Sequence, residues 1–201
     1  MLVHESVFTA DLGEDGYILG FAEHDGYPAE MPYGWRCGPV DNSSAVILTT
    51  TDTGPLQMTV QVHDSEPDPQ AADQWEPAEE MSLLSHGGPI HLELLDPGNV
   101  SEAWPEDEPA LHMPASPDAD QRVRMRLYCH ADDYEPGIGD RGERHLIQLW
   151  PAPATDPVHP PISDEDQRAR AEYATAMARQ AEQEGVDYTV HLTGDDLDAW
   201  H

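Results

Sequence analysis

Strict alternation of apolar and polar residues in the segment QRVRMRLYCH, residues 121–130, constrains the fold more than any other feature. Successive side chains of a β-strand point to opposite faces, so a period of two predicts a strand with one apolar face. The odd positions are expected to face the core and the arginines at even positions to face outward. The partner strand is expected at RHLIQLWP, residues 144–151. The apolar set is Val123, Met125, Leu127 and Cys129, and the arginines are Arg122, Arg124 and Arg126.

Similar period-two runs occupy most of the chain before residue 121. They predict strands at residues 4–12, 15–24, 44–52, 56–64, 80–88 and 89–96, with a further short strand at 186–192. Runs joined by a short turn are expected to pair as hairpins, 44–52 with 56–64 and 80–88 with 89–96. Short strands with long Gly- and Pro-rich loops predict a mainly β fold, an antiparallel β-sandwich with one C-terminal α-helix.

A proline-rich stretch divides the sequence. We expect a β-sandwich domain over residues 1–153, a linker over 154–162, and a helix, short strand and acidic tail over 163–201 that pack on the domain or on a partner. Ser163, followed by three acidic residues, is typical of a helix start. The residues of this last segment that would contact another subunit are Tyr173, Met177, Leu197 and Trp200.

The charge balance is the second strong signal. Nine arginines and no lysine stand against forty acidic residues, which gives a formal net charge of −31 at pH 7. Such a surface repels nucleic acid and anionic membranes and attracts basic proteins. Genome composition or adaptation to salt would give a similar composition, so the acidity alone does not establish a function.

Acidic residues are concentrated in two loops that each contain one tryptophan. Clustered carboxylates resemble the phosphates of nucleic acid and can bind the Lys/Arg groove of a nuclease or another nucleic-acid-binding protein. We therefore expect a non-enzymatic inhibitor, immunity-type protein or adaptor that docks on a basic protein. The three arginines of residues 121–130 are expected to act as structural counter-ions. The candidate partner-binding residues are Asp64, Glu66, Asp68, Asp73, Trp75, Glu76, Glu79, Glu80, Trp104, Glu106, Asp107 and Glu108.

No sequence pattern indicates a catalytic or metal site. The eleven histidines form no HExxH motif, and Cys37 and Cys129 lack the spacing of zinc ligands. Cys129 and His130, followed by two aspartates, form the densest ligand-type cluster, but neighbouring side chains on a strand point to opposite faces. We expect no metal, no cofactor and free buried thiols, with a disulfide between the two cysteines as the alternative.

The N-terminus lacks a basic region followed by an apolar run, and the sequence has no apolar stretch of about eighteen residues. These features predict a cytoplasmic protein that does not enter a membrane. The oligomeric state stays open.

One stretch, from Trp75 to Pro153, resembles known proteins. It runs through W-E-P-A-E-E-M-S-L, a Gly-Gly turn, R-V-R-M-R-L-Y, an acidic loop and E-R-H-L-I-Q-L-W-P-A. This order of features resembles uncharacterised β-sandwich proteins of actinobacteria and, more distantly, the competence protein J group, small acidic inhibitors of a DNA-entry nuclease. The resemblance implies a β-sandwich that binds and inhibits a protein and does not catalyse a reaction. The proline-rich stretch and the helix after it depart from the pattern.

Two other functions fit the same sequence. The segment 163–201 would dock the domain into a larger assembly if the protein is a structural subunit, because its apolar stripe is thin and Ala-rich. A carbohydrate- or ligand-binding sandwich would instead use Tyr27, Tyr33 and Trp35 as an aromatic platform.

Overall fold

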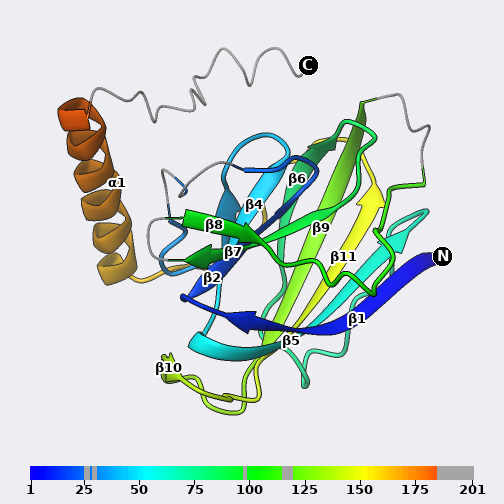
Figure 1. Cartoon of the computed structure of the whole chain (residues 1–201), viewed down its shortest axis with the longest axis horizontal. Coiled ribbons are helices and arrows are strands. Elements are labelled where there is room, and N and C mark those ends of the chain that lie inside the picture. Colours follow the sequence, from blue (N-terminus) through cyan, green and yellow to red (C-terminus); the bar gives the residue numbers. More distant parts are fainter. Residues whose placement is uncertain (25–27, 29–30, 97–98, 115–119, 185–201) are drawn as a thin grey trace.

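Two β-sheets make up most of the structure (Figure 1). Both contribute side chains to one apolar core. The computed structural model describes residues 1–24, 28, 31–96, 99–114 and 120–184, and these form eleven strands and one helix. The elements are β1 (Leu2–Leu12), β2 (Gly16–Gly20), β3 (Cys37–Pro39), β4 (Ser44–Leu48), β5 (Thr51–His63), β6 (Glu79–Ser85), β7 (His91–Asp96), β8 (Asn99–Glu102), β9 (Gln121–His130), β10 (Gly137–Ile138), β11 (Arg144–Pro151) and α1 (Asp164–Glu184).

The strands are distributed over a six-stranded sheet A and a five-stranded sheet B. Sheet A has the order β1-β5-β11-β9-β6, with the short β10 paired to β5, and sheet B has the order β3-β4-β2-β7-β8. The mainly β class with one helix is thereby confirmed. The expectation of purely antiparallel pairing is wrong, because β11 runs parallel to β5, with Ile147 opposite Val60. The more specific expectation of a β-sandwich stays a prediction.

Two of the predicted hairpins are also wrong. β4 and β5 follow one another closely but belong to different sheets, and so do β6 and β7. Where the chain passes from sheet B to sheet A, between β4 and β5, the backbone N–H groups of Thr50 and Thr51 donate to the buried Glu143 carboxylate. The alternation of a strand fixes which face is buried but does not decide which sheet the strand joins.

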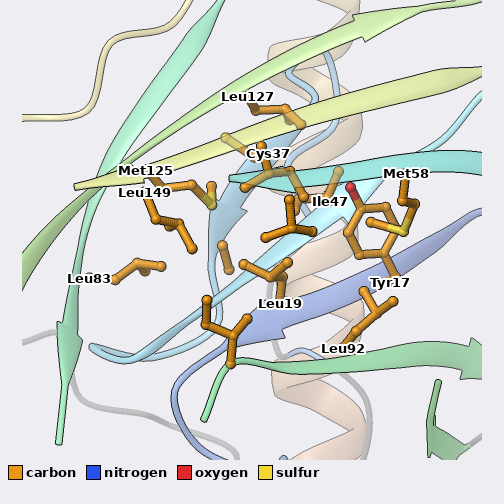
Figure 2. Close-up of a cluster of buried hydrophobic side chains, with 14 of the residues drawn as sticks. Tyr17, Leu19, Cys37, Ile47, Met58, Leu83, Leu92, Met125, Leu127 and Leu149 are labelled. Atoms are coloured by element: carbon orange, nitrogen blue, oxygen red, sulfur yellow. The ribbon is translucent and has the colours of Figure 1, made fainter. Parts of the chain in front are cut away.

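The pairing and the core face of β9 agree with the sequence. β9 pairs antiparallel with β11 over eight positions, from Arg144 opposite His130 to Pro151 opposite Val123. The apolar odd positions of β9 are all at most 3% exposed and lie in the main core, together with residues of sheet B such as Tyr17 and Ile47 (Figure 2). Cys37 and Cys129 are buried free thiols, as expected.

Other parts of the chain cover the outer face of sheet A, where the arginines of β9 lie. Arg124 and Arg126 are each 5% exposed. Two segments cover them, residues 64–78, which we call the acidic loop, and residues 152–160, which we call the covering segment. The alternation of β9 places these arginines correctly on the outer face, but it cannot show that other parts of the chain lie over that face.

The predicted linker 154–162 is in large part fastened to the edge of sheet A. Val158 donates to and accepts from the backbone of Glu80 at 2.8 and 2.9 Å, so the covering segment continues the sheet beyond β6. The Ser82 hydroxyl donates to the Thr155 carbonyl at 3.1 Å. These bonds hold the covering segment against the domain, and α1 begins a few residues after it.

Helix α1 begins as the sequence predicts. Ser163 Oγ accepts the backbone N–H of Asp166 at 3.1 Å, which is the expected N-cap. Tyr173 packs edge-on against Tyr33, with ring centroids 5.4 Å apart, and belongs to a second apolar cluster that includes Ile18 and Val46 of sheet B. The predicted strand 186–192 lies outside the described residues. No described helix combines the length and the hydropathy needed to cross a membrane.

A chain of buried polar groups joins the two sheets at one end of the core. The Tyr17 hydroxyl of sheet B is 2.8 Å from His145 Nδ1 of sheet A, and His145 Nε2 is 3.1 Å from Glu143. Burial alone would raise the pKa of Glu143. The hydrogen bond and charge of His145, together with the backbone N–H groups of Thr50 and Thr51, outweigh that effect and lower the pKa from 4.5 to about 2.

This depressed pKa predicts an acid-sensitive contribution to stability. Because the pKa of Glu143 is lower in the folded state, its contribution is complete above pH 4.5 and is lost as the pH falls towards 2. A shift of this size corresponds to on the order of 3 kcal/mol of unfolding free energy. Urea unfolding between pH 7 and pH 2 should show that Glu143→Gln loses this amount at pH 7 and has a flatter pH profile than the wild type. The exposed Glu135→Gln serves as the control, and a wild-type-like profile for Glu143→Gln would contradict the assignment.

Candidate functional site

Two buried arginines on the outer face of sheet A share one carboxylate. Arg124 Nε donates to Glu80 Oε2 at 3.1 Å, and Arg126 Nε donates to Glu80 Oε1. Charges interact more strongly in such a buried place than at an exposed surface. Pairing is also necessary there, because a buried cation without a partner destabilises the fold by several kcal/mol.

Each arginine also holds one part of the chain against the sheet: Arg126 holds the acidic loop, and Arg124 holds the covering segment. Arg126 donates to the Glu66 carboxylate at 2.7 Å and to the Pro67 carbonyl at 3.1 Å, which holds the first part of the acidic loop. Arg124 donates to the carbonyl oxygens of residues 155 and 156, both at 3.1 Å, which holds the covering segment. The guanidinium group of Arg126 lies 4.8 Å from the centre of the Trp150 ring, which fixes its position further.

The remainder of the acidic loop is held by contacts to β9. The backbone N–H of Gln70 donates to the Tyr128 hydroxyl at 3.0 Å, and the backbone N–H of Glu76 donates to the Cys129 carbonyl at 2.9 Å. The half-buried Trp75 packs against the Tyr128 ring, with centroids 5.9 Å apart. The loop is therefore attached along its length and does not move freely over the sheet.

Three of the predicted partner-binding acids serve the fold instead. Glu79 is 2% exposed and accepts the backbone N–H groups of Arg36 and Cys37. Glu76 pairs with the Arg36 guanidinium at 2.7 Å, and Glu80 is the carboxylate shared by the buried arginines. The reason is that β6 begins at Glu79, so its alternation sends this side chain inward and that of Glu80 to the covered outer face.

Four predicted acids of the acidic loop are exposed: Asp64, Glu66, Asp68 and Asp73. Asp64 pairs with the N-terminal amine, and Glu66 pairs with Arg126. Within the described part of the chain, no hydrogen bond or ion pair holds Asp68 or Asp73. These two carboxylates therefore face solvent from a loop whose backbone is anchored on both sides of them.

The second predicted acidic stretch lies against a different face of sheet A. Trp104 packs on Phe8 of β1, with ring centroids 5.3 Å apart, and Glu108 accepts a hydrogen bond from Ser6 at 2.5 Å. Phe8 packs on the core side of the sheet, whereas the acidic loop covers the outer side. Glu106 and Asp107 are exposed. The structure therefore does not bring the two stretches together on one face.

Most of the buried or half-buried arginines of the described residues are paired within the chain. Arg36 pairs with Glu76, Arg124 with Glu80, and Arg141 with Asp133, while Arg126 binds both Glu66 and Glu80. These cations therefore contribute little positive potential outside the molecule. With a formal net charge of −31, the excess at the surface is negative.

The other predicted surfaces are partly occupied by the chain itself. Tyr173 packs on Tyr33, and the Trp35 ring stacks on the His159 ring with a centroid distance of 4.0 Å and an angle of 5°. Tyr33 and Trp35 thus do not form an open aromatic platform. Four residues of these predictions lie outside the described residues or side chains, namely Tyr27, Met177, Leu197 and Trp200.

One cluster of chemically active side chains was missed from the sequence. Cys37, Glu79 and His159 place one sulfur, one oxygen and one nitrogen atom within 4.8 Å of one another. They come from β3, from β6 and from the covering segment, which are far apart in sequence. No short spacing could reveal them, because the contact depends on the pairing of Val158 with Glu80 and on the approach of β3 to β6.

Comparison with solved structures found distant similarities. One is to ComJ from Bacillus subtilis, an inhibitor of the DNA degrading activity of NucA, with a TM-score of 0.46 and 9% sequence identity over 76% of this chain and 99% of that chain. Another is to crocagin biosynthetic gene J, with a TM-score of 0.39 and 15% identity over 74% of this chain and 99% of that chain. No protein-family model and no curated protein match the sequence. The expected likeness to the competence protein J group is thus present as a distant structural similarity, and the actinobacterial resemblance stays a prediction.

The shared carboxylate predicts unequal effects of two arginine substitutions. Arg126→Met leaves Glu66 without its partner and Glu80 with one arginine, so we expect a loss of about 3 kcal/mol in unfolding free energy. Arg144→Met removes an exposed guanidinium that lies 5.3 Å from the Trp75 ring and should cost less than about 1 kcal/mol. Urea unfolding at neutral pH measures both, and equal losses would contradict the role assigned to Arg126.

Proposed function

We propose that the protein is a non-enzymatic acidic binding protein that docks on a basic protein partner. The partner class that fits best is a nuclease or another nucleic-acid-binding protein with a Lys/Arg-lined groove. In such a complex the carboxylates of the acidic loop take the places of nucleic-acid phosphates. The role is then that of an inhibitor, an immunity-type protein or an adaptor.

The observation that carries the proposal is the anchored acidic loop with Asp68 and Asp73 facing solvent. Arg126 holds the loop backbone at Pro67, before Asp68, and Tyr128 holds it between the two aspartates. Trp75 and Glu76 hold it after Asp73. A loop that is already ordered loses little conformational entropy on binding. The exposed carboxylates are thus presented in a fixed arrangement, which favours recognition of a fixed set of cations.

The distribution of charge supports the same function. The arginines beneath the acidic loop are neutralised by Glu66 and Glu80, so they do not cancel the field of the exposed aspartates. A net charge of −31 accelerates the encounter with a basic protein and makes the association rate dependent on salt. The same charge opposes binding to DNA itself.

A pair of charge-matched double variants tests the proposal. Asp68→Asn/Asp73→Asn removes the two free carboxylates of the acidic loop, whereas Glu165→Gln/Glu172→Gln removes two exposed carboxylates of α1. Binding to a panel of purified DNA-degrading nucleases and cationic DNA-binding proteins is measured at low and moderate salt. We expect the loop variant to weaken binding about tenfold and the helix variant to weaken it less than about threefold, with affinity falling as salt rises.

Three outcomes would contradict the proposal. They are the absence of binding to every protein of the panel, an affinity that does not change with salt, and equal effects of the two double variants. Inhibition of DNA degradation by a bound nuclease separates the inhibitor role from that of an adaptor.

A further inference from the structure

Cys37, Glu79 and His159 are arranged as ligands of a metal ion. Glu79 Oε2 lies 3.5 Å from Cys37 Sγ and 2.8 Å from His159 Nδ1, and the three ligand atoms are all within 4.8 Å of one another. Around a tetrahedral zinc ion, sulfur, nitrogen and oxygen ligands are separated by about 3.3–3.6 Å. The Cys37–Glu79 distance already fits, and the Glu79–His159 distance needs to lengthen by about half an ångström.

The hydrogen bonds of Glu79 leave one oxygen with more donors than it can serve. Oε1 accepts the backbone N–H of Arg36 at 2.7 Å. Oε2 is within reach of the backbone N–H of Cys37 at 3.1 Å, the Cys37 thiol and the His159 ring. A carboxylate oxygen has two lone pairs, so three donors exceed its capacity. A cation bound between the three side chains resolves the excess, because sulfur and nitrogen then direct lone pairs at the ion.

The cluster is enclosed, and two of its three side chains are acidic groups. Cys37 and Glu79 are buried, and the His159 side chain is 9% exposed. The Arg36 guanidinium is turned to Glu76 and not to Glu79. A divalent cation would balance a carboxylate and a thiolate in this enclosed place.

The histidine is held in the orientation that a ligand needs. The Trp35 ring stacks on the imidazole with parallel planes, and Trp35 Nε1 donates to the Pro160 carbonyl at 2.9 Å. The backbone bonds between Val158 and Glu80 fix the position of the neighbouring His159 along β6. Ligands that are fixed before binding favour affinity and selectivity.

From this geometry we propose that Cys37, Glu79 and His159 form a binding site for a divalent transition metal ion of the zinc class. A thiolate and an imidazole select such ions over Mg²⁺ and Ca²⁺, which prefer oxygen ligands only. Three protein ligands leave a fourth position for water or for an incoming group. The bound ion joins β3 of sheet B, β6 of sheet A and the covering segment, so it also fixes the chain that leads into α1.

Cobalt binding to the full chain tests the site directly. Co²⁺ is added to the protein kept reduced with a phosphine, and the near-ultraviolet absorption of a thiolate–cobalt bond is recorded. We expect a band that saturates at one equivalent and is displaced by Zn²⁺. Cys37→Ser should abolish the band, and His159→Gln should weaken Co²⁺ binding at least tenfold. Cys129→Ser, which removes the other buried thiol, should keep it.

The thermal unfolding temperature provides a second readout that does not depend on the band. Zn²⁺ should raise it for the wild type and for Cys129→Ser, but not for His159→Gln, whose substitution lies on the covering segment and leaves both sheets intact. The proposal is overturned if the wild type shows no thiolate–cobalt band. It is also overturned if Cys129→Ser removes the band, or if Zn²⁺ stabilises His159→Gln as much as the wild type, since ions on the acidic surface then account for binding.

Discussion

The ion pairs of the Glu80 carboxylate with Arg124 and Arg126 are the interactions on which the covered outer face of sheet A depends. Sheet A places two arginines side by side on one face, and a cation can be covered by other chain segments only if an anion is covered with it. Glu80 supplies that anion to Arg124 and Arg126, and its backbone also pairs with Val158. The acidic loop and the covering segment both lie over the sheet next to Glu80 and the two arginines that it pairs with. The position of His159 beside Glu79 follows from the same pairing.

Local sequence patterns predict much of the fold, and the predictions that are wrong have a common cause. The sequence correctly predicts the pairing of β9 with β11 and the core side of β9, and Ser163 correctly predicts the start of α1. The predicted hairpin of β4 with β5 fails because alternation describes the two faces of a strand and not its neighbours. The neighbours are decided by distant contacts, such as the bonds from Thr50 and Thr51 to Glu143.

The candidate site shows the same limit at the level of single side chains. Acidic composition singles out the acidic loop, yet only the structure separates Asp68 and Asp73, which face solvent, from Glu76, Glu79 and Glu80, which hold the fold together. In an acidic chain with few cations, each of these buried arginines pairs with a nearby carboxylate. Acidic residues that look equivalent in sequence therefore differ in whether they are paired within the chain or face solvent. The Cys37 cluster has no sequence signal because each of its three residues comes from a different part of the chain.

The parallel pairing of β5 with β11 has a consequence for how the chain reaches its final form. Some eighty residues separate the two strands, and β11 must insert between β5 and β9. Sheet A is therefore in two pieces until residue 151 has left the ribosome. Until then β5 and β9 each present an unpaired edge, the feature through which incomplete sheets aggregate. Such long-range closure is also slow. Like-charged chains repel one another, so the large net negative charge of this sequence opposes contact between unfinished chains during this interval.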